Sequence, residues 1–209
     1  MRGASGPTVL KLGGSYAFSP FLKNWIDAVK DCAGCVVLVP GGGPFADAVR
    51  AAQPRMGFDD RAAHEMAVLA MDQYGCALAH LGVPLRRAAS AAAIRNVLRL
   101  GGVPVWSPAQ MIRGEKDIPW CWDVTSDSLA AWLAGRLGAK RVVLVKHADV
   151  AAGPLRAEDL VAGGILDPAF PRFLRASGAE ASIAGPAGHS KAAVAIRNGE
   201  LVGARVDLR

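Results

Sequence analysis

The sequence predicts an α/β fold in which helices alternate with the strands of a mainly parallel sheet. Apolar runs, continuous or nearly so, occur at residues 8–12, 36–39 and 142–145, and they are typical of strands buried on both faces of such a sheet. Segments with apolar residues at helical spacing lie between the runs. Glycine strings follow the first two runs directly, GG at residues 13–14 and GGG at 41–43.

The first half of the chain supplies helices and strands in regular alternation. A long helix is expected from Asp59 or Asp60 to Leu81, with Gly82 as its stop. The other elements predicted here are helices over residues 20–29, 44–52 and 90–100, a short strand near residue 85 and a strand over 103–106.

The second half begins with an irregular segment, residues 107–124, which is rich in proline and tryptophan. Thr125 is then expected to cap a helix over 126–137 that Gly138 ends. Residues 151–164 are rich in alanine and glycine and are predicted to form a mobile loop. A helix over 168–176, a strand over 181–184, a helix over 190–197 and a strand over 201–206 complete the prediction.

The composition limits which classes of protein the chain can belong to. With 209 residues and 52% hydrophobic content, the chain can bury a core as one domain, or as two lobes that share one sheet. The net charge of +6 comes without a polybasic run, so small polyanions such as nucleotides are better candidates for partners than nucleic acid. No apolar stretch has the length of a bilayer span and no signal peptide is visible, so we expect a cytoplasmic protein whose four cysteines are reduced.

The first strand and its glycine string predict phosphate binding. Lys11 lies at the end of that strand, where its ammonium could stabilise a phosphoryl group that is being transferred. Glycine allows close approach of backbone N–H groups to phosphoryl oxygens, and the expected donors are those of Gly13, Gly14, Gly42 and Gly43. The alternative is that both strings are tight turns between strand and helix. Phosphoryl transfer is the first hypothesis, because a lysine accompanies the two glycine strings.

Two other motifs carry less weight. The string GGGPFA at residues 41–46 fits a dinucleotide-binding turn, but the acidic residues about twenty positions later begin a helix rather than end a strand. Cys32 and Cys35 form a CxxC that precedes a strand, and no second pair of closely spaced ligands accompanies them. The sequence therefore favours neither an oxidoreductase nor a metal site made by protein side chains.

Four strings together resemble the amino acid kinase family: KLGGS at residues 11–15, GGGP at 41–44, TSDSLA at 125–130 and VVLVKHAD at 142–149. The resemblance implies a three-layer αβα sandwich around a mainly parallel eight-stranded sheet. Two further strings, at 64–75 and 122–128, look most like the aspartokinase-like kinases of methanofuran biosynthesis. Those enzymes use ATP to convert (5-(aminomethyl)furan-3-yl)methyl phosphate to its diphosphate.

The resemblance also implies roles for single residues. Lys11 and Asp127 would be catalytic, with Asp127 orienting Lys11 and helping to place the nucleotide or its magnesium. Lys146 and Asp149 would bind the nucleotide. The alternatives are a carboxylate that complements a helix dipole, for Asp127, and a solvated strand end, for Lys146 and Asp149. The chain departs from the family at residues 147 and 150, where His and Val replace the usual Asp and Gly.

The acceptor site is expected on the long helix after the second glycine string. Arg61 or His64 could hold a substrate phosphate, and Asp60, with Asp59 or Glu65, could pair with an aminomethyl cation. An exposed helix face would explain the same residues equally well.

The sequence thus predicts a kinase that uses ATP and Mg²⁺, with an acceptor-binding half at about residues 1–122 and a nucleotide-binding half at about 123–209. Apolar helices such as 126–137 could form a subunit contact, so we expect a homo-oligomer. Two alternatives are open: another acceptor within the family, as in acetylglutamate, uridylate or isopentenyl phosphate kinases, or a storage or regulatory protein that binds anions without turnover.

Overall fold

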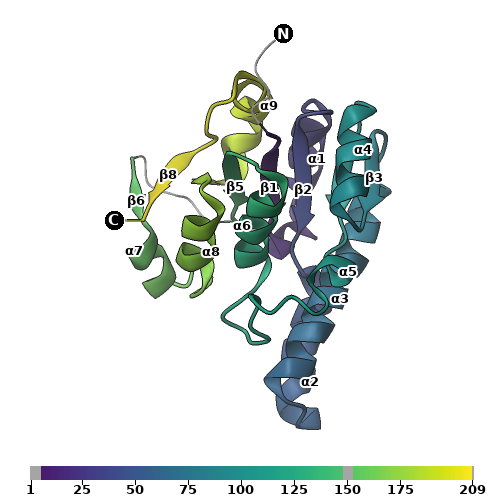
Figure 1. Ribbon diagram of the computed structural model, residues 1–209, viewed down its shortest axis with the longest axis vertical. Coiled ribbons are helices and arrows are strands. Elements are labelled where there is room, and N and C mark those ends of the chain that lie inside the picture. Colours follow the sequence, from purple (N-terminus) through teal and green to yellow (C-terminus); the bar gives the residue numbers. More distant parts are fainter. Residues whose placement is uncertain (1–5, 148–152, 209) are drawn as a thin grey trace.

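A computed structural model describes residues 6–147 and 153–208 and shows one eight-stranded sheet in this part of the chain (Figure 1). The strand order is β3-β4-β2-β1-β5-β7-β8-β6. The strands are β1 (Thr8–Leu12), β2 (Val36–Pro40), β3 (Leu85–Ala88), β4 (Val103–Trp106), β5 (Arg141–Val145), β6 (Leu155–Arg156), β7 (Glu180–Ala184) and β8 (Ala204–Asp207).

The sheet is mainly parallel. Strands β3, β4, β2, β1, β5 and β7 all run in one direction, β8 is antiparallel to β7, and β6 runs parallel to β8. Helices cover both faces, so the predicted three-layer αβα sandwich is confirmed. None of the helices in the described ranges is long and apolar enough to cross a membrane.

The predicted helices are present in the predicted order with shifted ends, and α5 and α7 are additional, because they lie in segments predicted to be irregular and a loop. The helices are α1 (Leu22–Lys30), α2 (Gly43–Met56), α3 (Asp60–Ala79), α4 (Ala91–Arg99), α5 (Ala109–Ile112), α6 (Ser126–Leu137), α7 (Ala157–Ala162), α8 (Phe170–Ser177) and α9 (His189–Asn198), with 3-10 turns at Gly14–Tyr16 and Pro186–Gly188. Helix α2 continues past the predicted end at Ala52 and accommodates Pro54, ending only at Gly57, which adopts a left-handed conformation with φ +74°.

The prediction of a mobile loop over residues 151–164 is wrong for the described part of that segment. Leu155 pairs with Val206 in the sheet, and α7 follows immediately. Ala157 and Leu160 are buried in the core, so apolar burial orders a stretch whose composition alone resembles a loop. The first two residues of the predicted loop lie outside the described ranges.

Alternate residues of the central strands face different helices. Val9 belongs to the core cluster that α6 and α8 complete, whereas Leu10 and Leu12 belong to the cluster that α1 and α9 complete. Because side chains alternate along a strand, Lys11 shares the face of Val9 and is directed towards α6. Figure 1 shows α6 and α8 side by side over that face of the sheet.

The carboxyl ends of the three central strands meet at one edge of the sheet. Leu12 at the end of β1 is in register with Pro40 of β2 and with Val145 of β5. The chain leaves β1 towards β2 on one side, while β5 flanks β1 on the other, so the strand order reverses at β1. Open α/β sheets place their ligand sites in the crevice at such a reversal.

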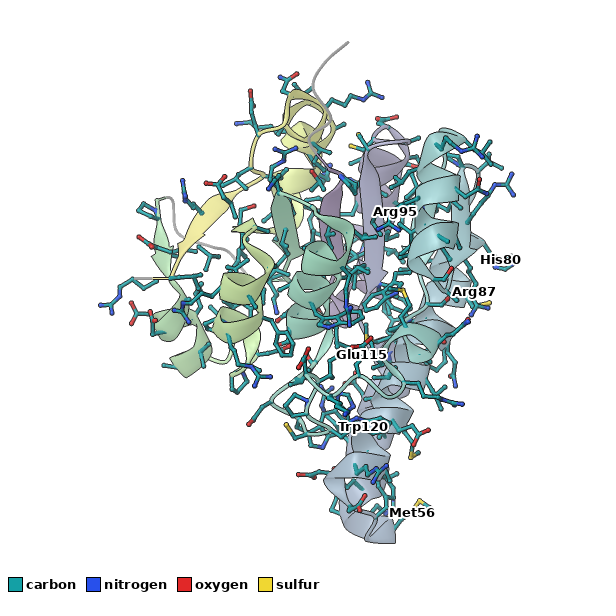
Figure 2. The ribbon with its side chains drawn as sticks, viewed as in Figure 1. Met56, His80, Arg87, Arg95, Glu115 and Trp120 are labelled. Atoms are coloured by element: carbon teal, nitrogen blue, oxygen red, sulfur yellow. The ribbon has the colours of Figure 1, made fainter. Side chains whose placement is uncertain are left out.

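A helical arm extends from this edge. Helices α2 and α3 pack against each other and project beyond the strands, and Met56 lies at the far end of the arm (Figures 1 and 2). The irregular segment before α6 returns alongside the arm, where Figure 2 shows Trp120. The crevice at the strand ends is therefore flanked by the arm.

Candidate active site

The two glycine strings pack directly against each other at the strand ends. A Cβ on Gly14 would lie 2.4 Å from the backbone nitrogen of Gly43, and a Cβ on Gly41 would lie 2.5 Å from that of Gly14. Gly43 also has φ +56°, a conformation that residues with side chains rarely adopt. These positions require glycine because the two backbones touch, and the contact brings two sets of N–H groups to one place.

A buried carboxylate joins two lysines beside these loops. Asp127 Oδ1 lies 2.8 Å from the Nζ of Lys11, and Asp127 Oδ2 lies 2.5 Å from the Nζ of Lys146. Lys11 comes from the end of β1, Lys146 follows β5, and Asp127 is in the first turn of α6. Three elements far apart in sequence thus place a single carboxylate between two ammonium groups.

The electrostatics of this cluster leave an excess of positive charge. Burial raises the pKa of Asp127, but the two lysines outweigh burial and hold the pKa below its ordinary value. Burial lowers the pKa of Lys146, as does the neighbouring Lys11, and Asp127 opposes both effects in part. Two cations for one anion give the cluster a surplus charge that suits a polyanionic ligand.

Asp167 fixes the first turn of α6 from outside the helix. Its carboxylate accepts hydrogen bonds from the backbone N–H of Thr125 (2.9 Å), the hydroxyl of Thr125 (2.6 Å) and the backbone N–H of Ser128 (3.0 Å). Thr125 is at the N-cap position as predicted, but its side chain makes no capping hydrogen bond. Burial, and then the nearby Asp127, raise the pKa of Asp167. Asp127 is therefore held in place by a second carboxylate that caps its helix.

Tyr16 holds the backbone of Lys146 close to the first glycine string. The Tyr16 hydroxyl donates a hydrogen bond of 3.0 Å to the carbonyl of Lys146, and the Tyr16 ring meets the ring of His147 edge-on. Tyr16 is fully buried, and burial raises its pKa to about 12. Its phenol is thus a fixed, neutral donor that ties the end of β5 to the loop after β1.

A cavity of about 450 Å³ opens above this cluster. Lys11, Asp127 and Lys146 form its central part, and the remaining lining comes from two sides. The arm supplies residues of α2 and α3, and residues 161–168 supply the opposite wall. Figure 1 shows α7 to the left of α6 and α2 below it, at the end of the arm. Its volume is within the range of small-molecule binding sites.

Most of the residues predicted for the site come together in this cavity. Its lining includes Lys11, Gly14, Gly42, Gly43, His64, Asp127 and Lys146. Gly13 is absent from the lining, and its N–H donates instead to the carbonyl of Val145 at 3.2 Å. Asp149 and the substitution at residue 150 lie outside the described residues.

The three predicted acceptor residues have different positions. His64 is buried and lines the cavity. Burial lowers the pKa of His64, and a hydrogen bond with the backbone of Val124 opposes this effect only in part. By contrast, Asp60 binds the side chain of Gln53 at 2.8 Å, and Arg61 stacks on Trp120. Asp60 and Arg61 do not line the cavity, so their binding role stays a prediction.

The charged and aromatic residues of the lining that the sequence analysis does not predict include Asp47, Arg50, Trp122 and Asp167. Arg50 follows the second glycine string by two helical turns, so a stricter count along α2 could have drawn attention to it. Asp167 contacts a helix that begins about forty residues earlier, and no local pattern signals such a contact.

The described residues offer little to a metal ion by themselves. They contain no group of three or more His, Cys, Asp or Glu side chains that could hold one. Both carboxylates near the lysines are occupied, Asp127 by the lysines and Asp167 by the start of α6. A divalent cation here would depend on oxygens that a ligand brings with it.

The fold and the cluster define an α/β protein with paired lysines and converging glycine loops at the switch point of its sheet, an arrangement that suits a phosphorylated ligand. The model of the amino acid kinase family matches residues 6–151, which is more than half of the sequence. The chain belongs to the amino acid kinase family, and this membership supports a phosphotransferase.

A curated relative agrees with this placement. The chain is 24% identical to [5-(aminomethyl)furan-3-yl]methyl phosphate kinase of Methanocaldococcus jannaschii over 143 residues. The match covers 68% of this chain and 66% of the relative, slightly under two thirds of that protein's length.

Solved structures confirm the fold. The uridylate kinase of Archaeoglobus fulgidus superposes with a TM-score of 0.72 at 18% identity, covering 96% of this chain and all of that one. The UMP kinase of Ureaplasma parvum superposes with a TM-score of 0.68 at 14% identity, covering 98% of this chain and all of that one. At such identities the likeness establishes the fold alone.

Proposed function

We propose that this protein transfers the γ-phosphoryl group of ATP to the phosphate of a small molecule, with (5-(aminomethyl)furan-3-yl)methyl phosphate as the acceptor and its diphosphate as the product. The observation that carries the proposal is the cluster of Lys11, Asp127 and Lys146 beside two converging glycine loops. The named relative supports the choice of acceptor.

The reaction exchanges one phosphorus–oxygen bond for another. An oxygen of the acceptor phosphate attacks the γ-phosphorus, a P–O–P bond forms, and the bond from the γ-phosphorus to the β–γ bridging oxygen breaks, so that its electron pair leaves with ADP. An acceptor phosphate is largely dianionic near neutral pH, so no base has to remove a proton from the nucleophile. The main barrier is repulsion between two polyanions.

The two lysines are placed to overcome this repulsion. In the proposed mechanism the ammonium groups of Lys11 and Lys146 contact the oxygens of the transferred group, and Asp127 keeps both at a fixed separation when no ligand is bound. Gly42 and Gly43 open α2, where the N–H groups of the first turn have no partner within the helix and can bind phosphate.

The two walls of the cavity suggest how the substrates divide it. The nucleotide would bind on the side of residues 161–168, consistent with the predicted nucleotide half at 123–209. The acceptor would bind on the side of the arm, in the predicted half at 1–122, where the buried imidazole of His64 lines the wall. Magnesium would enter as a complex with the nucleotide.

An acceptor panel tests the proposed reaction. Purified protein is incubated with ATP and Mg²⁺ and either the furan phosphate, UMP, isopentenyl phosphate or acetylglutamate, and ADP and the phosphorylated product are measured. We expect the highest kcat/KM with the furan phosphate. A higher kcat/KM with acetylglutamate or UMP would show that the proposed acceptor is wrong. ADP production at the same rate with and without an acceptor would contradict transfer to a small molecule.

Replacement of Lys11 distinguishes an enzyme from a protein that only binds nucleotides. Lys11→Met keeps the unbranched apolar stem of the side chain and removes its ammonium group, and we expect kcat to fall by about 10²- to 10³-fold, as for loss of one oxyanion-stabilising donor. Lys23→Met is the control, because Lys23 is also paired with an aspartate but is 83% exposed. Equal turnover in the wild type and Lys11→Met would exclude the role given to Lys11.

A further inference from the structure

We infer that the arm side of the cavity contains a subsite for an acceptor that carries both a phosphate and an amine, formed by Arg50, Asp47 and Trp122. This inference rests on the proposed function and specifies which residues select its acceptor. All three side chains line the same cavity as the lysine cluster. None of them belongs to the set of acceptor residues that the sequence predicts.

Arg50 is the cation that remains for the phosphate of the acceptor. The cations among the described lining residues are Lys11, Lys146 and Arg50. Both lysines are bound to Asp127 and lie where the transferred group must be. A second phosphate, that of the acceptor, therefore has Arg50 as the available cation on the arm side, and a guanidinium binds phosphate with two parallel hydrogen bonds.

Trp122 holds the guanidinium of Arg50 in a defined position. The Arg50 Cζ lies 4.7 Å from the centre of the Trp122 ring, which is the geometry of a cation–π contact. The indole N–H of Trp122 donates a hydrogen bond of 2.8 Å to the side chain of Gln53, one turn further along α2. The indole is thereby fixed against the arm, and it gives this wall of the cavity an aromatic surface suited to a small ring.

Asp47 supplies the complementary negative charge. The carboxylates in the lining are Asp47, Asp127 and Asp167, and the last two are committed to the lysines and to the first turn of α6. Asp47 is 74% exposed and lies 3.0 Å from Arg50 in an ion pair one turn apart on α2. Such exposed pairs contribute only about 0–1 kcal/mol, so a ligand can replace the pair at little cost. A ligand with its phosphate on Arg50 and its ammonium on Asp47 would replace the ion pair between these two residues by two ion pairs with the ligand.

The neighbouring helix carries the competing acceptor residues, those that the sequence predicts. Arg61 stacks on Trp120 with its Cζ 5.4 Å from the ring centre, and Asp60 hydrogen-bonds to Gln53, yet neither Arg61 nor Asp60 lines the cavity. Two arginine–tryptophan pairs of the same chemistry therefore lie along the arm, and only that of Arg50 lines the cavity. Substitutions at Arg61 and Asp60 test the competing prediction, and Arg55→Gln is the control for charge, because Arg55 is an exposed cation of α2 that does not line the cavity.

The test compares Arg50→Gln and Asp47→Asn with the competing variants Arg61→Gln and Asp60→Asn and with the control Arg55→Gln, measuring kcat and the KM values for ATP and for the acceptor. The acceptors are the furan phosphate and an analogue with a methyl group in place of the aminomethyl group. We expect Arg50→Gln to raise KM for both acceptors by about tenfold or more, as for loss of one charge-assisted hydrogen bond, with KM for ATP unchanged. We expect Asp47→Asn to raise KM only for the acceptor that has the amine, Arg61→Gln and Asp60→Asn to change KM less than these two variants do, and Arg55→Gln to resemble wild type.

The outcomes separate this inference from the proposed function. If the wild type phosphorylates the furan phosphate but Arg61→Gln raises its KM while Arg50→Gln does not, the subsite is wrong and the function stands. If Asp47→Asn affects both acceptors equally, Asp47 does not recognise the amine. If the wild type uses only a carboxylate acceptor, the proposed function fails and the subsite fails with it. Thermal denaturation of every variant establishes that each is folded.

Discussion

At the scale of single residues, the site consists of one buried and one partly buried ammonium group that share one buried carboxylate. Lys11 and Lys146 would repel each other without Asp127, and Asp127 would be costly to bury without them. The arrangement therefore stabilises itself while leaving one positive charge in surplus. When a phosphoryl group enters, its oxygens can take over part of the role of Asp127 without any large movement of the lysines.

The pH dependence of activity should reveal Lys146. Burial lowers the pKa of Lys146 below its ordinary value of 10.5, so its charge is lost, and the rate falls, as pH rises through that lowered pKa. Lys146→Arg keeps the charge at every accessible pH, so we expect it to move the alkaline limb of the kcat/KM profile to higher pH. An alkaline limb that is the same in wild type and Lys146→Arg would contradict this assignment.

Folding stability should change with pH in the opposite direction to activity. The pKa of Lys146 is lower in the folded state than in the unfolded state. Between these two pKa values the unfolded state binds more protons, so the contribution of Lys146 to folding stability increases with pH. Thermal denaturation at the same pH values therefore separates the two causes of lost activity. If activity falls while stability is maintained, the site is titrating and the protein is not unfolding.

At the scale of elements, the start of α6 determines where Asp127 lies. Asp127 is near the N-terminus of this helix, and Asp167, from the segment between α7 and α8, accepts the hydrogen bonds that hold the first turn. The C-terminal part of the sheet thereby positions a residue that acts on Lys11 of the first strand. Asp167 is a positioning residue, since it acts through Asp127.

Asp167→Asn should reduce turnover more than its effect on stability explains. An amide oxygen cannot accept all three hydrogen bonds equally well, so we expect a lower kcat, an unchanged KM for the acceptor and about 1 kcal/mol lower stability. Ser90→Ala is the control, because Ser90 caps α4 with one hydrogen bond of 3.1 Å to the N–H of Ala93, away from the cavity. If kcat falls equally in both variants, Asp167 only caps its helix and does not position Asp127 for catalysis.

The limits of sequence reasoning also appear at this scale. Apolar runs and glycine strings predicted β1, β2 and β5 because buried parallel strands have a continuous apolar pattern. Local patterns could not predict α7, since alanine and glycine composition does not reveal the sheet pairing of Leu155 or the burial of Leu160. The role of Asp167 depends on the same tertiary arrangement, so local sequence patterns could not predict it either.

At the scale of the whole molecule, the site follows from the order of the strands. Strands β1, β2 and β5 are central neighbours, and their carboxyl ends are in register, so the residues that follow them must converge. Lys11, Gly14, Gly43 and Lys146 could be predicted as a group for this reason. The arm is different: its charged residues form a similar pattern on α2 and α3, and only the three-dimensional packing shows that Arg50 and not Arg61 lines the cavity.

The most direct test of the account is a crystal structure of the protein with ADP, Mg²⁺, aluminium fluoride and the furan phosphate, in which aluminium fluoride occupies the place of the transferred phosphoryl group. We expect the fluoride ligands to lie within hydrogen-bond distance of the Nζ atoms of Lys11 and Lys146, beside the N–H groups of the two glycine strings, with the acceptor phosphate on the arm side. An aluminium fluoride group bound away from both lysines would contradict it.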